Sequence, residues 1–162
     1  MHSAIVSKYL GANVICLTTS IGKENKIREL TNSEVILLDE FDFSEIIMAM
    51  TDDLGVDLVV NTVGASVFER SIRSLNQFGT MLVFGEIEGA KTSVNLAELI
   101  FRNISINSSC GANKSDILEA INLVNTGQLK PVVSEVFKLE EANKAFDKII
   151  DRHSLGRVVL TP

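Results

Sequence analysis

The sequence of 162 residues contains no tryptophan, two prolines, two cysteines and two histidines. Cys16 and Cys110 lie far apart and outside any CxxC spacing, so we expect neither a disulfide framework nor a cysteine-based metal site. No apolar run approaches the roughly 20 residues of a membrane-spanning helix, and the N-terminus lacks the basic and apolar segments of a secretion signal. We therefore expect a soluble, cytoplasmic protein with no membrane partner.

Blocks of like charge are also missing. The net charge of −6 comes from scattered acidic residues, and no basic patch with interleaved aromatic residues is present, so no nucleic-acid partner is predicted. The sequence contains no GxSxG nucleophile motif, no GxxxxGK[ST] phosphate loop and no cluster with metal-ligand spacing. With 46% hydrophobic residues, the chain can form one globular domain over residues 1–162.

Short runs of valine, isoleucine and leucine alternate with amphipathic stretches. This order predicts an α/β protein, a doubly wound parallel sheet of the Rossmann-like kind, with strands buried on both faces. Ser115 is the expected N-cap of one helix, with Gly127 beyond its end and Pro131 after it. The expected strands are 13–19, 34–38, 56–63, 80–85, 104–109 and 158–162, and the expected helices are 4–10, 23–31, 43–53, 66–75, 115–127 and 139–152.

Ligands of such a fold bind at the carboxyl ends of the strands, and the first of these ends is Thr18-Thr19-Ser20. An acidic residue at this place would bind the ribose hydroxyls of NAD, whereas hydroxyl side chains with Lys23 and Lys26 nearby would favour the 2′-phosphate of NADP. The alternative is that Thr18 to Ser20 only cap the following helix. The sequence favours neither interpretation over the other.

Three further strand ends are small or polar. Gly64 in the stretch NTVG allows a ligand to approach the backbone, as does Gly85 of FGEIEG, although a local turn would also explain each. The loop Ser108 to Gly111 could leave room for a flat ring or form a turn. Cys110 is not predicted to be a nucleophile, because neither His2 nor His153 stands in a context that would activate it.

Other polar and apolar groups are assigned structural roles. The acidic residues Asp39, Glu40 and Asp42 are expected to form a solvated turn. Ile46, Ile47 and Met50 are expected to pack in the core, because they share one helix face.

The order of these motifs resembles the cofactor-binding domain of the medium-chain dehydrogenase/reductase superfamily, especially its quinone reductase and zinc-type alcohol dehydrogenase branches. The matching text includes AIVSKYLGANVICLTTS, GVDLVVNTVG, FERSIRSLNQFGTMLVFG, RNISINSS, TGQLKPVVSEVFKLEEANKAF and LGRVVLTP. The resemblance covers essentially the whole chain. It departs from the family where GAD is expected before strand 34–38, since Thr31, Asn32 and Ser33 stand there.

The resemblance implies that a first strand, its glycine-rich loop and an N-terminal catalytic domain stand ahead of Ala4 in relatives. That domain carries the zinc ligands of the zinc-dependent branch, so no zinc ligand or catalytic residue is expected in this chain. The first strand would lie between strands 13–19 and 56–63. Without it, we expect those two strands to close up or another segment to fill the gap, because open edges promote aggregation.

The resemblance also implies positions along the cofactor and a homodimer that pairs strands near Arg102 to Ser108. The expected cofactor-binding residues are Thr18, Thr19, Ser20, Lys23, Thr62, Val63, Gly64, Phe84, Gly85, Ser108 and Ser109.

Two functions follow as hypotheses. The first is the NADP-binding part, with NAD possible, of an oxidoreductase that transfers hydride to or from a carbonyl, alcohol or enone and is completed by a separate catalytic domain or chain. The second is a non-catalytic remnant or dimeric interaction module that no longer binds cofactor. An unrelated doubly wound protein such as a methyltransferase is disfavoured, because no acidic residue ends strand 13–19 to bind a ribose.

Overall fold

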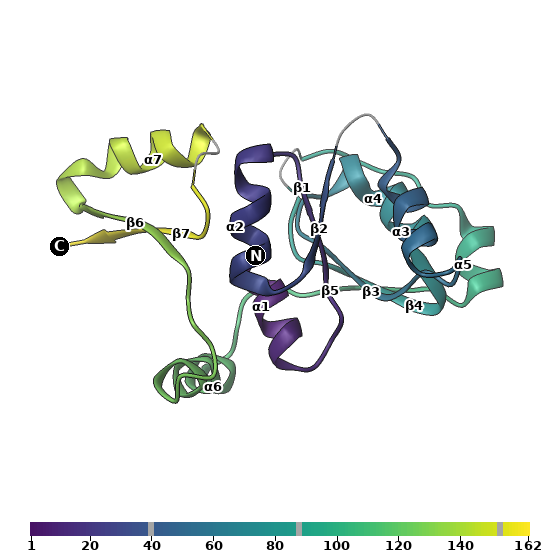
Figure 1. Cartoon of the computed structure of the whole chain (residues 1–162), viewed down its shortest axis with the longest axis horizontal. Helices are drawn as coiled ribbons and strands as arrows, with labels where there is room; N and C mark the ends of the chain where they lie inside the picture. Colours follow the sequence, from purple (N-terminus) through teal and green to yellow (C-terminus); the bar gives the residue numbers. More distant parts are fainter. Residues whose placement is uncertain (39–40, 87–88, 152–153) are drawn as a thin grey trace. The chain divides into compact units, whose positions relative to one another are not determined.

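The computed structural model describes residues 1–38, 41–86, 89–151 and 154–162. The chain separates into two compact units: unit 1 comprises residues 1–38 and 113–162, and unit 2 comprises residues 39–112. Figure 1 shows the helices and strands of both units along the chain. Every strand pair is parallel, and helices alternate with strands, which confirms the predicted α/β, Rossmann-like class.

The first half of unit 1 is a βαβ element with a helix ahead of it. The helix α1 (His2–Tyr9) leads to β1 (Ile15–Thr18), α2 (Ile21–Thr31) and β2 (Glu34–Leu37). The strands β1 and β2 pair in parallel, and α2 packs against both. Asn32 ends α2 in the left-handed conformation, with φ of 48°, and thereby turns the chain back into β2.

The second half of unit 1 contains α6 (Lys114–Asn125), β6 (Val133–Lys138), the 3₁₀ turn η1 (Leu139–Glu141), α7 (Ala142–Ile150) and β7 (Arg157–Thr161). The strands β6 and β7 form a parallel pair, and α7 lies along them (Figure 1). None of the helices in the described parts of the chain has the length and hydropathy that a bilayer crossing requires.

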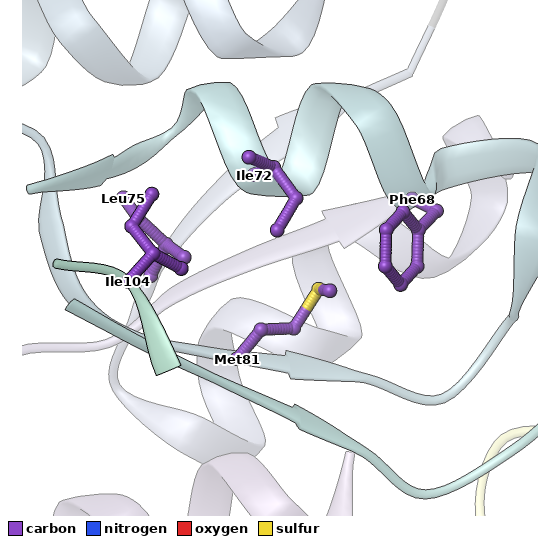
Figure 2. Close-up of a cluster of buried hydrophobic side chains, with 5 residues drawn as sticks. All are labelled: Phe68, Ile72, Leu75, Met81 and Ile104. Carbon is purple, nitrogen blue, oxygen red and sulfur yellow. The ribbon is translucent and has the colours of Figure 1, made fainter. Parts of the chain in front are cut away.

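Unit 2 is a three-stranded parallel sheet in the order β3-β4-β5. It contains α3 (Phe43–Met50), β3 (Val56–Asn61), α4 (Ala65–Arg73), β4 (Leu75–Val83), α5 (Leu96–Arg102) and β5 (Ser105–Ser108). Its core joins the apolar face of α4 to the sheet: Figure 2 shows Phe68 and Ile72 of α4 above Met81 of β4, beside Leu75 and Ile104. This packing fixes α4 relative to the ends of β3 and β4.

Several predicted boundaries differ from the structure. The sequence pattern did not predict α5 or β6, and β4 begins at Leu75 rather than at residue 80. A bulge explains the missed start of β4, because the pairing register of β3 and β4 shifts between Leu75 and Thr80. Within the described residues the strands pair as β1-β2, β3-β4-β5 and β6-β7.

The prediction that all strands are buried on both faces is wrong for β1, β5 and β7. No residue of β1 or β7 is fully buried, and all four residues of β5 are exposed. β5 has a neighbouring strand on one side only, and in the sheet of β1 the buried apolar residues belong to β2, at Val35 and Ile36. Apolar composition alone cannot distinguish an edge strand from a central one.

Of two predicted details of α6, one is corrected and one is confirmed. The N-cap of α6 is Asn113 rather than Ser115: the Asn113 side chain accepts from the backbone N–H of Asp116, whose carboxylate accepts from the Asn113 N–H. This reciprocal pair satisfies two helix-end donors at once, which Ser115 inside the helix cannot do. Gly127 follows the helix with φ of 73°, as predicted.

The acidic turn and the apolar stripe of α3 are each corrected in part. Asp42 is the N-cap of α3 rather than a solvated turn residue, since its carboxylate accepts from the Ser44 N–H at 2.9 Å and pairs with Arg73 at 2.5 Å. Ile47 is buried and Ile46 half-buried, but Met50 is exposed, so the predicted core role of Met50 is wrong. Asp39, Glu40 and His153 lie outside the described residues.

Candidate functional site

The first group of predicted site residues lies in unit 1, where β1 passes into α2. Thr18 is the last residue of β1, Ser20 is the N-cap position of α2, and Lys23 lies in the first turn of that helix. The Thr18 Oγ1 accepts a hydrogen bond from the Ser20 N–H at 3.2 Å, so it shapes this turn. Thr19 between them is exposed. The strand-to-helix turn therefore gathers hydroxyl groups at a helix N-terminus.

The charge of this group comes from Lys23. Its ammonium donates to the backbone carbonyl of Ser154 at 2.9 Å, a contact inside unit 1 that holds the side chain near the start of β7. The Ser20 side chain makes no capping bond to α2, so the interpretation of Thr18 to Ser20 as helix caps is supported only through the Thr18 hydroxyl. Hydroxyl and ammonium donors at a helix N-terminus suit a phosphate monoester.

The second group lies in unit 2, at the carboxyl edge of its sheet. Asn61, Val83 and Ser108 are in register across the three parallel strands, and the Phe84 N–H donates to the Asn61 carbonyl at 2.8 Å. The predicted residues that follow these strand ends therefore share one edge of the sheet. These residues are Thr62, Val63, Gly64, Phe84, Gly85, Ser108 and Ser109.

Most of this second group is accessible. Thr62, Val63, Phe84, Ser108 and Ser109 are exposed, whereas Gly64 is buried and Gly85 half-buried. A Cβ atom at Gly85 would lie 2.7 Å from the carbonyl oxygen of Thr62, so a glycine is required where the ends of β3 and β4 approach each other. The edge offers apolar side chains, Val63 and Phe84, beside hydroxyl groups. That combination suits a flat, partly polar ring.

Asn61 organises this edge, although the sequence analysis did not single it out. Its side chain is buried, its Oδ1 accepts from the N–H groups of Val63 at 3.0 Å and Gly64 at 2.8 Å, and its Nδ2 donates to the Gly64 carbonyl at 3.1 Å. An asparagine that ends a strand three residues before a glycine is a sequence signal for such a turn. Glu86 lies within the strand end FGEIEG considered in the sequence analysis, but was not singled out as a site residue.

A hollow of about 520 Å³ in unit 2 lies away from these residues. It opens at the amino end of β4, between the Asp53–Leu54 turn and Arg102. Its two arginines are engaged: Arg73 pairs with Asp42, and Arg102 donates to the Ile72 and Leu75 carbonyls. None of the predicted site residues lines the hollow, and we assign it no role.

The described side chains provide little acid, base or metal chemistry. No group of three or more histidine, cysteine or carboxylate side chains within residues 1–38, 41–86, 89–151 and 154–162 could hold a metal ion. Burial raises the pKa of Asp42, but hydrogen bonds from Ser44 and the nearby guanidinium of Arg73 outweigh it and lower the pKa overall. Asp42 is therefore a helix cap that stays ionised rather than a proton donor.

Comparison with known proteins gives a consistent family match. The zinc-binding dehydrogenase family matches residues 32–160. Acryloyl-coenzyme A reductase of Metallosphaera sedula is 30% identical over 162 residues, covering 99% of this chain and 47% of that protein. An NAD-dependent alcohol dehydrogenase of Saccharolobus solfataricus is 30% identical over 121 residues, covering 72% of this chain and 33% of that protein.

A solved structure gives the same match at the level of the fold. The crystal structure of AibC superimposes with a TM-score of 0.91 at 29% identity, and covers 99% of this chain and 45% of AibC. The chain therefore spans about half the length of the Metallosphaera protein, of which 47% is covered, and of AibC, and a third of the Saccharolobus protein.

Proposed function

Because the chain belongs to the zinc-binding dehydrogenase family of the medium-chain dehydrogenase/reductase superfamily, we propose that it is the cofactor-binding part of an NAD(P)-dependent oxidoreductase. The proposed reaction is hydride transfer between the nicotinamide and a small carbonyl, alcohol or enone. The observation that carries this proposal is the register of Asn61, Val83 and Ser108, which brings the loops after β3, β4 and β5 to one edge.

The residues of that edge have separate proposed roles. Val63 and Phe84 would contact the faces of the nicotinamide ring, and the hydroxyls of Thr62, Ser108 and Ser109 would bind its carboxamide. The nicotinamide, when bound, supplies the hydride chemistry, and the protein orients it. We assign no catalytic residue to this chain. A separate catalytic domain or chain would provide the substrate contacts, in keeping with the 47% coverage of the Metallosphaera relative.

We further propose a preference for NADP over NAD. The turn from Thr18 to Lys23 contains hydroxyls and an ammonium group, and its sequence TTSIGK has no carboxylate that would repel a 2′-phosphate. NAD is still compatible with the fold, as the name of the Saccharolobus relative indicates for that protein. The unpaired Cys16 and Cys110 fit the reducing cytoplasm that we propose as its location.

Titration of the purified chain with NADPH and NADH tests this function. Nicotinamide fluorescence and the thermal midpoint should both respond to NADPH at micromolar concentrations, because a ligand at 100 times its Kd stabilises the folded state by about 2.7 kcal/mol. Weaker or absent binding of NADH would support the phosphate preference. A lack of response to both nucleotides would reject cofactor binding by this chain.

A second candidate is a dimeric interaction module, which the edge strand β5 favours. All four residues of β5 are exposed, the preceding helix α5 has no buried residue, and Ile100 and Phe101 of α5 are exposed. An edge strand such as β5, which pairs with β4 on one side, can pair on its other side with a second copy of itself. We propose a homodimer through the stretch Arg102 to Ser108. A dimer that binds neither NADPH nor NADH would favour this candidate over the first.

A further inference from the structure

The carboxylate of Glu86 occupies the N-terminus of α4. Its Oε2 accepts a hydrogen bond from the Ala65 N–H at 2.8 Å, and its Oε1 accepts from the Ala90 N–H at 3.4 Å. Ala65 is the first residue of α4, and Glu86 follows β4 at a separation of 21 residues. The contact therefore links the loop after β3 to the loop after β4.

The local backbone is built around this contact. Gly64, at the N-cap position of α4, has φ of 112° and no side chain to cap the helix. A Cβ atom at Gly64 would lie 2.2 Å from Glu86 Oε2, so a side chain there would displace the carboxylate. Asn61 closes the other side of the same turn through its three bonds to Val63 and Gly64. Hydrogen bonds with Asn61 and with Glu86 thus hold the Thr62–Ala65 turn on its two sides.

We propose that Glu86 is a positioning residue for the cofactor-binding edge of unit 2. This inference rests on the proposed function, because it concerns the shape of the Thr62–Ala65 turn to which the nicotinamide would bind. The negative carboxylate replaces the missing N-cap side chain and complements the helix dipole. Its negative charge also disfavours a cofactor phosphate at this helix end, where the Ala65 N–H is already engaged. The edge is thereby left to the uncharged carboxamide.

Amide hydrogen exchange tests the contact without any ligand. In Glu86→Ala, exchange at the Ala65 amide should accelerate about tenfold, since a charge-assisted bond is lost. In Glu86→Gln, the remaining amide oxygen should keep exchange near that of the unsubstituted chain. Glu69→Gln, which alters an exposed carboxylate on the same helix, is the matched control. Equal exchange at Ala65 in all four proteins would overturn the proposal.

A double-mutant cycle tests the link between Gly64 and Glu86. Gly64→Ala alone should lower the thermal midpoint through both the unfavourable φ and the clash with Glu86. In the Glu86→Ala background the clash is absent, so Gly64→Ala should lower the midpoint less. Strictly additive shifts would show that the two residues do not interact and would overturn the proposal.

NADPH titration then distinguishes an effect of Glu86 on cofactor binding from an effect on folding stability alone. Glu86→Ala should weaken NADPH binding about tenfold, as expected for the loss of one charge-assisted bond. Glu86→Gln, which keeps an acceptor oxygen, should bind NADPH within about threefold of the unsubstituted chain. Unchanged binding in Glu86→Ala would overturn the positioning role and leave the proposed function intact. If the unsubstituted chain binds no nucleotide, the proposed function and the positioning role both fail, and the exchange and cycle data still decide whether the contact exists.

Discussion

The imidazole Nε2 of His2 accepts a hydrogen bond from the backbone N–H of Val132 at 3.2 Å, although the two residues are 130 positions apart. The contact connects the start of α1 to the segment before β6, both in unit 1. Only an unprotonated Nε2 can accept this bond. Partial burial, then the Arg157 guanidinium and the N-terminal ammonium, lower the pKa of His2 from its ordinary value of 6.5.

This contact predicts a pH dependence of stability. The unfolded chain takes up a proton at His2 near pH 6.5, whereas the folded chain does so only at a lower pH. The free energy of unfolding should therefore decrease as the pH falls from 6.5 through the lowered pKa. Well above pH 6.5, where His2 is neutral in both states, it should contribute no slope. Urea denaturation over this range should show a smaller slope in His2→Gln. Identical slopes would contradict the assignment.

The backbone conformation of Phe78 predicts that a substitution at this position will stabilise the folded chain. Its φ of 68° is unfavourable for a bulky residue, and its side chain is 70% exposed, so little packing is lost by replacing it. Asn32 and Asn103 already occupy this conformation elsewhere in the chain. Phe78→Asn should raise the free energy of unfolding by about 1 kcal/mol. Phe101→Asn, at an exposed helical phenylalanine, is the control, and an equal effect of both would reject the explanation.

The burial of Met81 predicts how much stability a cavity in the core of unit 2 would remove. It is fully buried beneath Phe68 and Ile72 (Figure 2), so Met81→Ala should lower the free energy of unfolding by about 2–5 kcal/mol. Met50→Ala makes the same chemical change at a side chain that is 45% exposed, and should cost much less. Denaturant titration compares the two. Similar losses would mean that the cluster is not the stabilising core.

Lys23 predicts the selectivity for the 2′-phosphate. Lys23→Gln removes the ammonium from the β1–α2 turn, and should weaken NADPH binding about tenfold by removing one charge-assisted contact while leaving NADH binding unchanged. Because Lys23 also bonds Ser154, the thermal midpoint of the variant must be measured alongside. Lys8→Gln on α1 controls for the loss of one positive charge. Parallel weakening of both nucleotides would argue against phosphate recognition.

Ile106 predicts the oligomeric state. It lies in the middle of the exposed edge strand β5, where a lysine would oppose its own copy across a two-fold interface. Ile106→Lys should therefore shift the protein from dimer to monomer in sedimentation velocity. Ile117→Lys, at an exposed position on α6, should leave the distribution unchanged. A protein that is monomeric without either substitution would reject the proposed interface.

The sequence predicted most elements because their local signals were strong. The helix from Ala65 to Arg73 and the strand from Val56 to Asn61 follow clear periodic patterns and were placed within a few residues. α5 was missed because seven residues are too few for a clear amphipathic repeat, and β6 because VSEVFK mixes polar and apolar residues. The register shift between Leu75 and Thr80, where Phe78 has a positive φ, concealed the first residues of β4.

The sequence by itself determined the α/β class, the parallel pairing and the family, because these depend on the order of many short patterns along the chain. Only the tertiary structure decided which side chains meet. The bond from Ala65 to Glu86 and the contact of His2 with Val132 join residues 21 and 130 positions apart. Periodicity indicates which face of an element is apolar. Contacts between residues so far apart in the sequence depend on how the elements pack, which no local pattern encodes.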